Sequence, residues 1–401
     1  MNLAYSKKKD LRILVLGYII RGPMGGMTWH HLQYLLGLKE LGFDVFYLED
    51  SGDTPYCCYD PQRGTTDANP SYGLQYAFEV FDRFGFKNHW AYYNKHHQRW
   101  EGPMAGKVME VVRGSDLVLN LSCSNILRPW FQDVPIRVLV DTDPVFTQIR
   151  NLIDAERWQL TNLHNAFFSF AENIGRPSCS IPDDGIKWMS THQPVVLSAW
   201  PVGEGCPNGK FTTIMQWESY PSREYQGNRY GVKADSFGNY FELPTRTSSS
   251  FEIALGGPSA PRQKFKDHGW LLKDPIAVAN DPLSYKQYIE HSKAEFSIAK
   301  QAYVVAKTGW FSERSTCYLA TGRPVVVQDT GFSHLIESGK GILSFKTPEE
   351  ASEAIDSVNK NYKEHCRVAR ILAEEYFNSA IVLNNLIDKS LELVRESIIK
   401  H

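Results

Sequence analysis

The stretch that most restricts the fold runs from residue 309 to residue 332 and reads GWFSERSTCYLATGRPVVVQDTGF. It contains a polar turn, a short helical run at 317–320 and an apolar run at 325–327. Three consecutive apolar residues are typical of an inner strand of a parallel sheet, which is covered on both faces. Gly322 follows the helical run, where a left-handed residue ends a helix at low cost. The stretch therefore predicts one helix and strand of an α/β domain.

The polar residues before this helical run indicate an anion site. Ser312, Arg314, Ser315 and Thr316 place hydroxyls and a guanidinium beside the free backbone N–H groups with which a helix begins. The alternative is an ordinary helix with a polar N-cap and no ligand.

The same alternation of strands and helices occupies both halves of the chain. Apolar runs predict strands at 11–19, 116–122, 136–143 and 166–171, and a second series begins after a polar segment at 182–194. A chain of 401 residues is too long for one ordinary core. We expect an α/β fold of two Rossmann-like domains, residues 1–190 and 191–375, followed by a helix at 376–401 that could pack back on the N-terminal domain.

Composition argues against two classes of partner. The net charge of −2 leaves no basic surplus for a phosphate backbone, and the only lysine run is at residues 7–9, so we do not expect nucleic acid as a partner. The sequence contains no run of eighteen apolar residues, so we expect no membrane span. Its first residues lack the apolar core of a signal peptide, so we expect a cytoplasmic location.

The seven cysteines are scattered and include no CxxC spacing. Cys57 and Cys58 are adjacent, as are His30 and His31, which suits neither an ordinary disulfide nor the i, i+4 spacing of a helical metal site. We expect reduced thiols and no structural metal.

The order of segments in the C-terminal half resembles the donor-binding half of nucleotide-sugar glycosyltransferases with the GT-B fold, which has two facing Rossmann-like domains and a cleft between them. The resemblance rests on a glycine-bearing turn and helix from residue 309, the Gly-Arg-Pro-Val-Val run from Gly322, a small-residue loop from Asp329, a Glu-plus-Gly segment at 337–341, a strand at 342–345 and a helix from Pro348. It implies a metal-independent, Leloir-type transfer from a nucleoside-diphosphate sugar, most often a UDP-sugar, to a hydroxyl or other nucleophile of a small-molecule or glycan acceptor. The 1–190 domain would then be the acceptor side.

The resemblance also assigns roles to individual residues. The glycine loop with Gly25 and Gly26 occupies the place where the family's loop meets the diphosphate or the acceptor, and Lys233 resembles the lysine that assists the diphosphate. Asp329, at the end of the VVVQD strand, would accept hydrogen bonds from sugar hydroxyls, with a cap on the next turn as its alternative. The hydroxyls and guanidinium at 312–316 would bind the diphosphate in place of a metal ion.

One position departs from the family's pattern. Retaining members of its largest branch carry two glutamates seven residues apart, and Cys317 occupies the place of the second. The ribose-binding role of that glutamate is therefore not carried over, and the stereochemical outcome stays open with a lean to inversion.

Three residues of the first domain are candidates for the base that takes the acceptor proton. His30 follows the glycine loop, and an imidazole is suited to proton uptake near neutral pH, although His31 could be the exposed one of the pair. Asp141 and Asp143 lie at the carboxyl end of a predicted strand, where one of them could equally be a buried cap.

Two other functions use a similar framework. A nucleotide-sugar epimerase of the same fold and a non-catalytic nucleotide-sugar-binding protein both remain alternatives. Dinucleotide binding is disfavoured because RGPMGG lacks the G-x-G-x-x-G spacing.

Overall fold

The computed structural model describes residues 11–399, which form two compact units. Within these residues, the first unit extends to Thr142 and adds Asn151–Phe168 and the segment from Ser379, whereas the second holds Asp143–Arg150 and Ser169–Asn378. The chain thus leaves the first unit after Thr142, returns at Asn151, leaves again after Phe168 and returns at Ser379.

The first unit follows a strand and helix alternation. Its elements are β1 (Arg12–Leu16), α1 (Gly25–Glu40), β2 (Asp44–Asp50), β3 (Cys58–Asp60), β4 (Thr65–Asp67), α2 (Ser71–Arg83), β5 (Trp90–Asn94), β6 (Arg99–Glu101), α3 (Val108–Arg113), β7 (Leu117–Leu121), β8 (Ile136–Asp141), α5 (Ala155–Thr161), β9 (Ala166–Ser169) and α15 (Ser379–Ile399).

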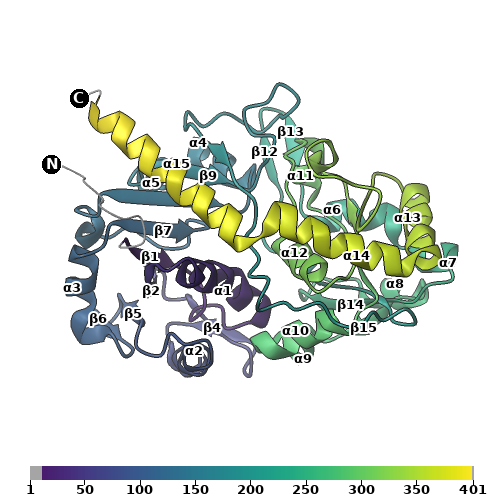
Figure 1. Ribbon diagram of the computed structural model, residues 1–401, viewed down its shortest axis with the longest axis horizontal. Helices are drawn as coiled ribbons and strands as arrows, with labels where there is room; N and C mark the ends of the chain where they lie inside the picture. Colours follow the sequence, from purple (N-terminus) through teal and green to yellow (C-terminus); the bar gives the residue numbers. More distant parts are fainter. Residues whose placement is uncertain (1–10, 400–401) are drawn as a thin grey trace. The chain divides into compact units, whose positions relative to one another are not determined.

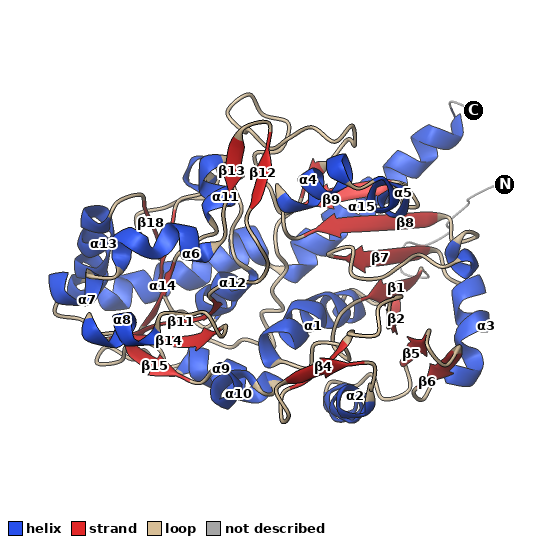
Figure 2. Cartoon of the chain, turned by 180° about the vertical axis from the view of Figure 1, so that it is seen from behind, coloured by secondary structure: helices blue, strands red, loops and turns tan. Residues whose placement is uncertain are grey.

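The main sheet of this unit is parallel at its centre. Its strands lie in the order β9-β8-β7-β1-β2-β5-β6, and β1 pairs in parallel with both β2 and β7. Every residue of β7 is buried, since helices cover both faces of an inner parallel strand. Figure 2 shows β7 and β8 side by side, in agreement with their parallel register.

The last helix, α15, belongs to the first unit and runs along α1 (Figure 1). The two helices approach closely at Gly37, where an added Cβ would lie 2.6 Å from Leu383 Cδ1 and 2.9 Å from Ser379 Cβ. A side chain at this position would push the helices apart, so we infer that glycine is needed there for close packing.

The second unit is also built of strands and helices. Its elements are α4 (Phe146–Ile153), which ends in the first unit, β10 (Met189–Ser190), β11 (Phe211–Gln216), β12 (Arg223–Tyr225), β13 (Asn228–Tyr230), α6 (Lys233–Ser236), α7 (Leu243–Arg246), β14 (Phe251–Gly256), α8 (Arg262–Asp267), β15 (Leu271–Lys273), α9 (Pro275–Ala279), α10 (Pro282–Glu290), β16 (Ala294–Ser297), α11 (Gln301–Val305), α12 (Glu313–Ala320), β17 (Val325–Gln328), β18 (Ile342–Phe345), α13 (Pro348–Lys360) and α14 (Tyr362–Leu372).

A six-stranded parallel sheet forms the centre of this unit, in the order β15-β14-β11-β16-β17-β18. All residues of β14, β16 and β17 are buried. The expectation of an α/β protein with doubly wound parallel sheets is confirmed. Because the strands are parallel, the carboxyl ends of β16 and β17 lie next to each other and their loops meet.

The helix after the polar turn begins earlier than the sequence predicted. Ser312 is its N-cap, and Glu313 is already helical, so Arg314, Ser315 and Thr316 lie in the first turn of α12 rather than before it. Gly322 follows the helix with a φ of +73°, as expected for a left-handed residue. The region 219–247, which shows no clear pattern in the sequence, folds as the β12–β13 hairpin and short helices.

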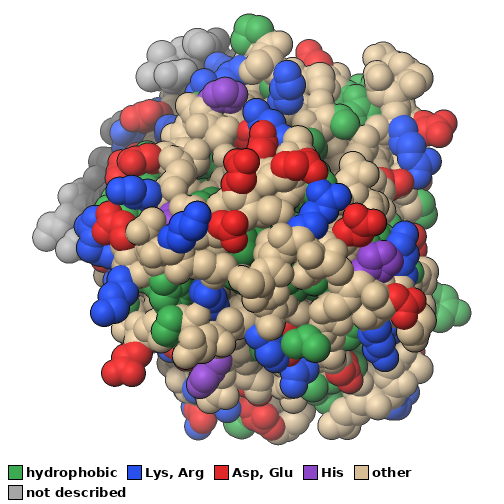
Figure 3. Space-filling view, turned by 90° about the vertical axis from the view of Figure 1, so that its right-hand side faces the viewer, with side chains coloured by type: hydrophobic (Ala, Val, Ile, Leu, Met, Phe, Trp, Pro, Cys, Tyr) green, Lys and Arg blue, Asp and Glu red, His purple; other side chains and the backbone are tan. Residues whose placement is uncertain are grey.

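The surface charge is mixed. On the face shown in Figure 3, lysine and arginine side chains are interspersed with aspartate and glutamate side chains. This agrees with the small net charge of the chain. None of the helices within residues 11–399 combines the length and the apolar character that a bilayer crossing requires.

Candidate functional site

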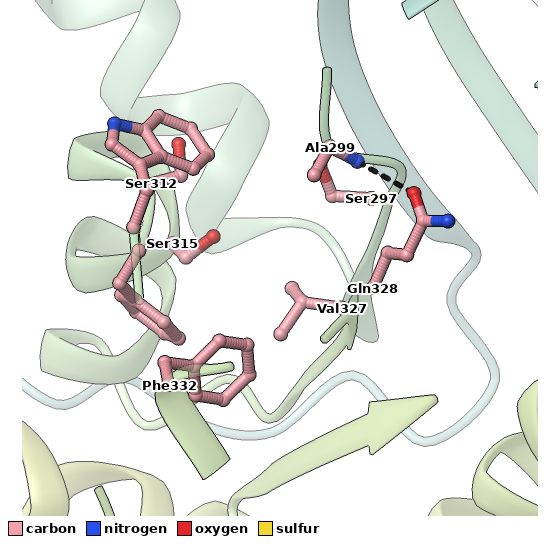
Figure 4. A pocket seen from close by; sticks show the side chains of 9 residues that line it. Ser297, Ala299, Ser312, Ser315, Val327, Gln328 and Phe332 are labelled. Carbon is pink, nitrogen blue, oxygen red and sulfur yellow. Dashed lines mark hydrogen bonds between the residues drawn. The ribbon is translucent and has the colours of Figure 1, made fainter. Parts of the chain in front are cut away.

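A small cavity lies where the carboxyl ends of β16 and β17 meet the start of α12. Its volume is about 20 Å³, which is enough for one water molecule but not for a larger ligand without local opening. It is lined by Ser297, Ala299, Trp310, Phe311, Ser312, Ser315, Val327, Gln328 and Phe332 (Figure 4). This is the edge of a parallel sheet at which ligands bind in open α/β folds.

Two of the hydroxyls predicted to bind an anion line this cavity. Ser312 Oγ accepts a hydrogen bond from the Arg314 N–H at 3.2 Å. Ser315 is fully buried, and within the described part of the chain its Oγ has no hydrogen-bond partner. A buried hydroxyl without a partner costs free energy, which a ligand oxygen at this position would recover.

Arg314 does not lie as the sequence predicted. Its Nε donates to Glu295 Oε1 at 2.7 Å, while its terminal nitrogens donate to the Ile214 carbonyl and to Ser297 Oγ. Burial lowers the pKa of this guanidinium, but the charges of Glu295 and Glu313, the Tyr285 side chain and the hydrogen bond to Glu295 together outweigh burial and raise the pKa overall. The guanidinium is thus committed to the protein interior, and we no longer expect it to bind a diphosphate directly.

Two further side chains predicted to contact the donor form hydrogen bonds within the protein instead. Thr316 Oγ1 donates to the Glu313 carbonyl within α12. Asp329 accepts the Gly331 N–H at 2.9 Å and the Ser333 hydroxyl at 2.9 Å, which matches the alternative of a turn cap. Local hydrogen bonds occupy both side chains, so neither is retained as a contact of the donor.

Lys233 is the first residue of α6, and the residue as a whole is half-buried. Burial lowers its pKa to about 7, and the positive charges of Arg314 and Lys300 add to the effect. No hydrogen bond or ion pair within residues 11–399 holds this ammonium, so it is available to an anionic ligand. Its predicted role in diphosphate binding remains a prediction, now with a physical basis.

Asp143, a candidate base, lies in the second unit and is bound by three donors. Lys300 Nζ lies 2.8 Å from its Oδ1, and the hydroxyls of Tyr220 and Tyr303 also donate to the carboxylate. These three donors already occupy the carboxylate oxygens that would have to accept the acceptor's proton.

The glycine loop of the first unit is held by a buried carboxylate. Glu49 accepts the backbone N–H groups of Ile19, Ile20 and Arg21 at 2.7 to 2.8 Å, and the Arg21 Nε lies 3.2 Å from it. The N–H groups and the guanidinium fix the path of the loop that leads to Gly25 and Gly26, the first residues of α1. The contact of these glycines with a ligand stays a prediction.

The adjacent histidines of α1 differ in environment. His31 is 1% exposed, and burial lowers its pKa well below the usual value. Its Nε2 accepts the Tyr18 N–H at 3.0 Å, so the ring is neutral and donates from Nδ1 to the Met27 carbonyl. His31 is therefore the internal member of the pair, and His30 is half-buried. Asp141 ends β8 and is 1% exposed, which favours a structural role.

Sequence reasoning missed three residues of this cavity and the lysine that follows them. Ser297 and Ala299 line the cavity, and Gln328 Oε1 accepts the Ala299 N–H at 3.1 Å (Figure 4). Lys300 follows them directly. The sequence could have indicated Lys300, because it is a charged residue that follows an apolar strand. Asp141 and Asp143 were selected by the same criterion.

Within residues 11–399, no group of three or more His, Cys, Asp and Glu side chains is arranged to hold a metal ion. All seven cysteines are free thiols.

No protein-family model matches the sequence, and neither does any protein of curated function. Solved structures do match in fold. An alpha-glucosyltransferase in complex with UDP superposes with a TM-score of 0.55 at 10% identity, covering 95% of this chain and 100% of its own. The Anabaena protein Alr3699/HepE, in complex with UDP and glucose, gives 0.53 at 11% identity, with 96% and 100% covered. Sucrose-phosphate synthase from Thermosynechococcus elongatus gives 0.52 at 11% identity, with 96% and 100% covered.

One expectation from composition is wrong. Several structures with this fold are alpha-glucosyltransferases in complex with DNA and either UDP or UDP-glucose. One of them, with UDP and DNA, has a TM-score of 0.57 at 12% identity, with 95% of this chain and 100% of its own covered. The exclusion of nucleic acid fails because net charge describes the whole chain, whereas a nucleic-acid contact depends on local charge. Along nearly its whole length, the chain has the GT-B fold of these glycosyltransferases.

Proposed function

We propose that the protein is a Leloir-type glycosyltransferase that uses a nucleoside-diphosphate sugar, with a UDP-sugar as the first donor to test. The observation that carries the proposal is the cavity at the carboxyl ends of β16 and β17, into which the unpartnered Ser315 hydroxyl faces. The ammonium of Lys233 is close enough to Arg314 of α12 and to Lys300 for their charges to lower its pKa. The GT-B fold and the UDP in several of its structural neighbours support the choice of donor.

The chemistry requires two functions from the protein. The acceptor oxygen attacks the anomeric carbon, the bond from this carbon to the diphosphate oxygen breaks, and the diphosphate leaves with the electron pair. Cations and helix N–H groups stabilise the negative charge that develops on the leaving group. A base takes the proton of the acceptor, and we assign this role to His30, since Asp141 is buried and Asp143 is bound by three donors.

We further propose that donor binding needs no metal ion. Lys233, Lys300 and the first turn of α12 supply positive potential where other enzymes use a divalent cation. A cytoplasmic location is part of the proposal, since all seven cysteines are free thiols.

Nucleotide binding tests the proposal directly. We expect UDP to raise the melting temperature of the full chain, because a ligand that binds only the folded state stabilises it, and we expect the same rise in excess EDTA. GDP, ADP, CMP and dTDP serve as comparisons for the nucleobase. If none of these nucleotides shifts the melting temperature, the proposal is wrong; if EDTA abolishes the shift, only metal independence is wrong.

Turnover separates an enzyme from a binding protein. We expect release of UDP from a UDP-sugar in the presence of an acceptor, and the acceptor panel should contain simple sugars, glycans and duplex DNA. DNA is included because structural neighbours were solved with it. Interconversion of the donor sugar without transfer would instead identify an epimerase.

The pKa of Lys233 predicts proton uptake on binding. With a pKa of about 7, Lys233 is largely neutral in the free protein at pH 8, and a bound diphosphate raises the pKa of this amine by favouring its charged form. Binding at pH 8 should therefore take up close to one proton at this residue, and UDP affinity should fall as pH rises above 7. Titration calorimetry in buffers of different ionisation enthalpy measures the uptake.

Lys233→Met is the matched variant for this prediction, because it keeps the length of the side chain and removes the amine. We expect it to lose the proton uptake and to bind UDP more weakly by about 1.5–3 kcal/mol, the range for a hydrogen bond to a charged group. Unchanged proton uptake in this variant would assign the titration to another group.

A further inference from the structure

Lys300 lies in an aromatic and acidic surrounding in the second unit. Its Nζ is 2.8 Å from Asp143 Oδ1 and also donates to the Tyr220 hydroxyl. It stands over the rings of Phe146, Tyr220 and Tyr303, at 5.1, 4.4 and 5.3 Å from their centroids. The side chain of Lys300 is 16% exposed and that of Asp143 is 28% exposed. The Lys300 side chain is thus mostly buried and held by several partners, and part of the ion pair is exposed.

The position of Lys300 connects this cluster to the candidate donor site. Lys300 lies beyond the carboxyl end of β16 and directly follows Ala299, which lines the cavity. The positive charge of Lys300 lowers the pKa of Lys233, so the two ammonium groups are close enough to repel each other. In the free protein, Asp143 offsets the charge of Lys300, whereas no ion pair within residues 11–399 offsets that of Lys233.

We propose that Lys300 is a second diphosphate-binding cation and that Asp143 holds it in place until the donor arrives. This inference rests on the proposed function. The diphosphate competes with Asp143 for the ammonium, and the flexible four-carbon stem of a lysine allows its charge to turn from one anion to the other. Asp143 thereby acts as a substitute anion and a positioning residue.

The surrounding packing makes this exchange reversible. The residues after Asp143, Val145, Phe146 and Ile149, pack with Ala302 and Tyr303 in one buried apolar cluster of the second unit. These contacts keep the carboxylate close to Lys300 after the ion pair opens. The hydroxyls of Tyr220 and Tyr303 continue to donate to it, so the released carboxylate is not left without partners.

Titration calorimetry with UDP on the full chain tests the inference through three variants, Lys300→Met, Asp143→Asn and the double variant. Lys300→Met should weaken UDP binding about 10-fold or more, as expected for a charge-assisted contact. Asp143→Asn removes the competitor and should strengthen UDP binding about fivefold, the effect of one partly exposed ion pair. In the Lys300→Met background, Asp143→Asn should have no effect.

Uridine and a second ion pair are the controls. Uridine lacks phosphates, so its binding should not change in any of the variants. Lys210 and Glu252 form a partly buried ion pair in the same unit, with Lys210 just before β11 at the opposite end of the sheet. Lys210→Met should leave UDP binding unchanged. Should Lys300→Met not fold, as judged by circular dichroism, Lys300→Gln replaces it.

The outcomes separate this inference from the proposed function. If the wild-type chain binds no nucleoside diphosphate, both are wrong. If it binds UDP but Lys300→Met and Lys300→Gln bind equally well, or if Asp143→Asn strengthens binding equally with and without Lys300, this inference alone is wrong and the cluster is a static ion pair.

Discussion

Replacement of Arg314 by alanine should lower the free energy of unfolding by about 3–5 kcal/mol, the usual cost of leaving a buried charge without its partner. Glu295 is 0% exposed, and Arg314 is the cation at 2.7 Å from its Oε1. The same substitution would remove the donors to the Ile214 carbonyl and Ser297 Oγ. We expect a large loss of stability and only an indirect effect on nucleotide binding, which urea denaturation and calorimetry measure separately.

Two further variants show whether the buried charge is the cause. Glu295→Gln in the Arg314→Ala background removes the unpaired carboxylate and should recover part of the lost stability. Arg63→Ala is the matched control, because Arg63 pairs with Asp60 and Asp67 at the surface, where solvent screens the charges. Arg63→Ala should change stability little. A loss for Arg314→Ala no larger than that for Arg63→Ala would contradict our account of this ion pair.

The second large effect concerns the base. His30→Ala should reduce kcat by roughly 10²–10⁴-fold with nearly unchanged UDP affinity, the range for loss of a general base. The acidic limb of the pH profile should disappear with it. His30 is favoured because His31 is neutral and internal, Asp141 is buried and Asp143 is bound by three donors.

His89→Ala is the control for this prediction. His89 is also a half-buried histidine of the first unit, packed against Phe46, and we place it outside the site. It should retain turnover. A carboxylate base would instead give an acidic limb at lower pH and a mild effect of His30→Ala. Turnover like that of the wild type in the alanine variants of His30, Asp141 and Asp143 would exclude all three residues.

The proposed exchange at Lys300 explains how the donor site keeps two lysines close together before a diphosphate binds. Lys233 is held partly neutral by burial and by its cationic neighbours, and Lys300 is offset by a carboxylate. The free protein therefore avoids two adjacent unpaired charges, and the full positive potential develops only when a diphosphate is present.

The sequence by itself determined the architecture. Apolar runs such as Val325–Val327 and Leu117–Leu119 specify inner parallel strands, because only a strand covered on both faces tolerates apolar residues at every position. Gly322 specified the end of α12 for a local steric reason. The same local rules placed Ser312 and Ser315 at the sheet edge where the cavity lies.

Only the tertiary structure decided which polar side chains remain available to a ligand. Arg314 and Asp329 have the chemistry of donor-binding residues, yet Glu295 and the Gly331–Ser333 turn occupy them. Two of the partners of Asp143, Tyr220 and Lys300, lie 77 and 157 positions further along the chain. Hydrogen bonds between residues so far apart in sequence depend on how strands and loops pack, and no local pattern encodes them.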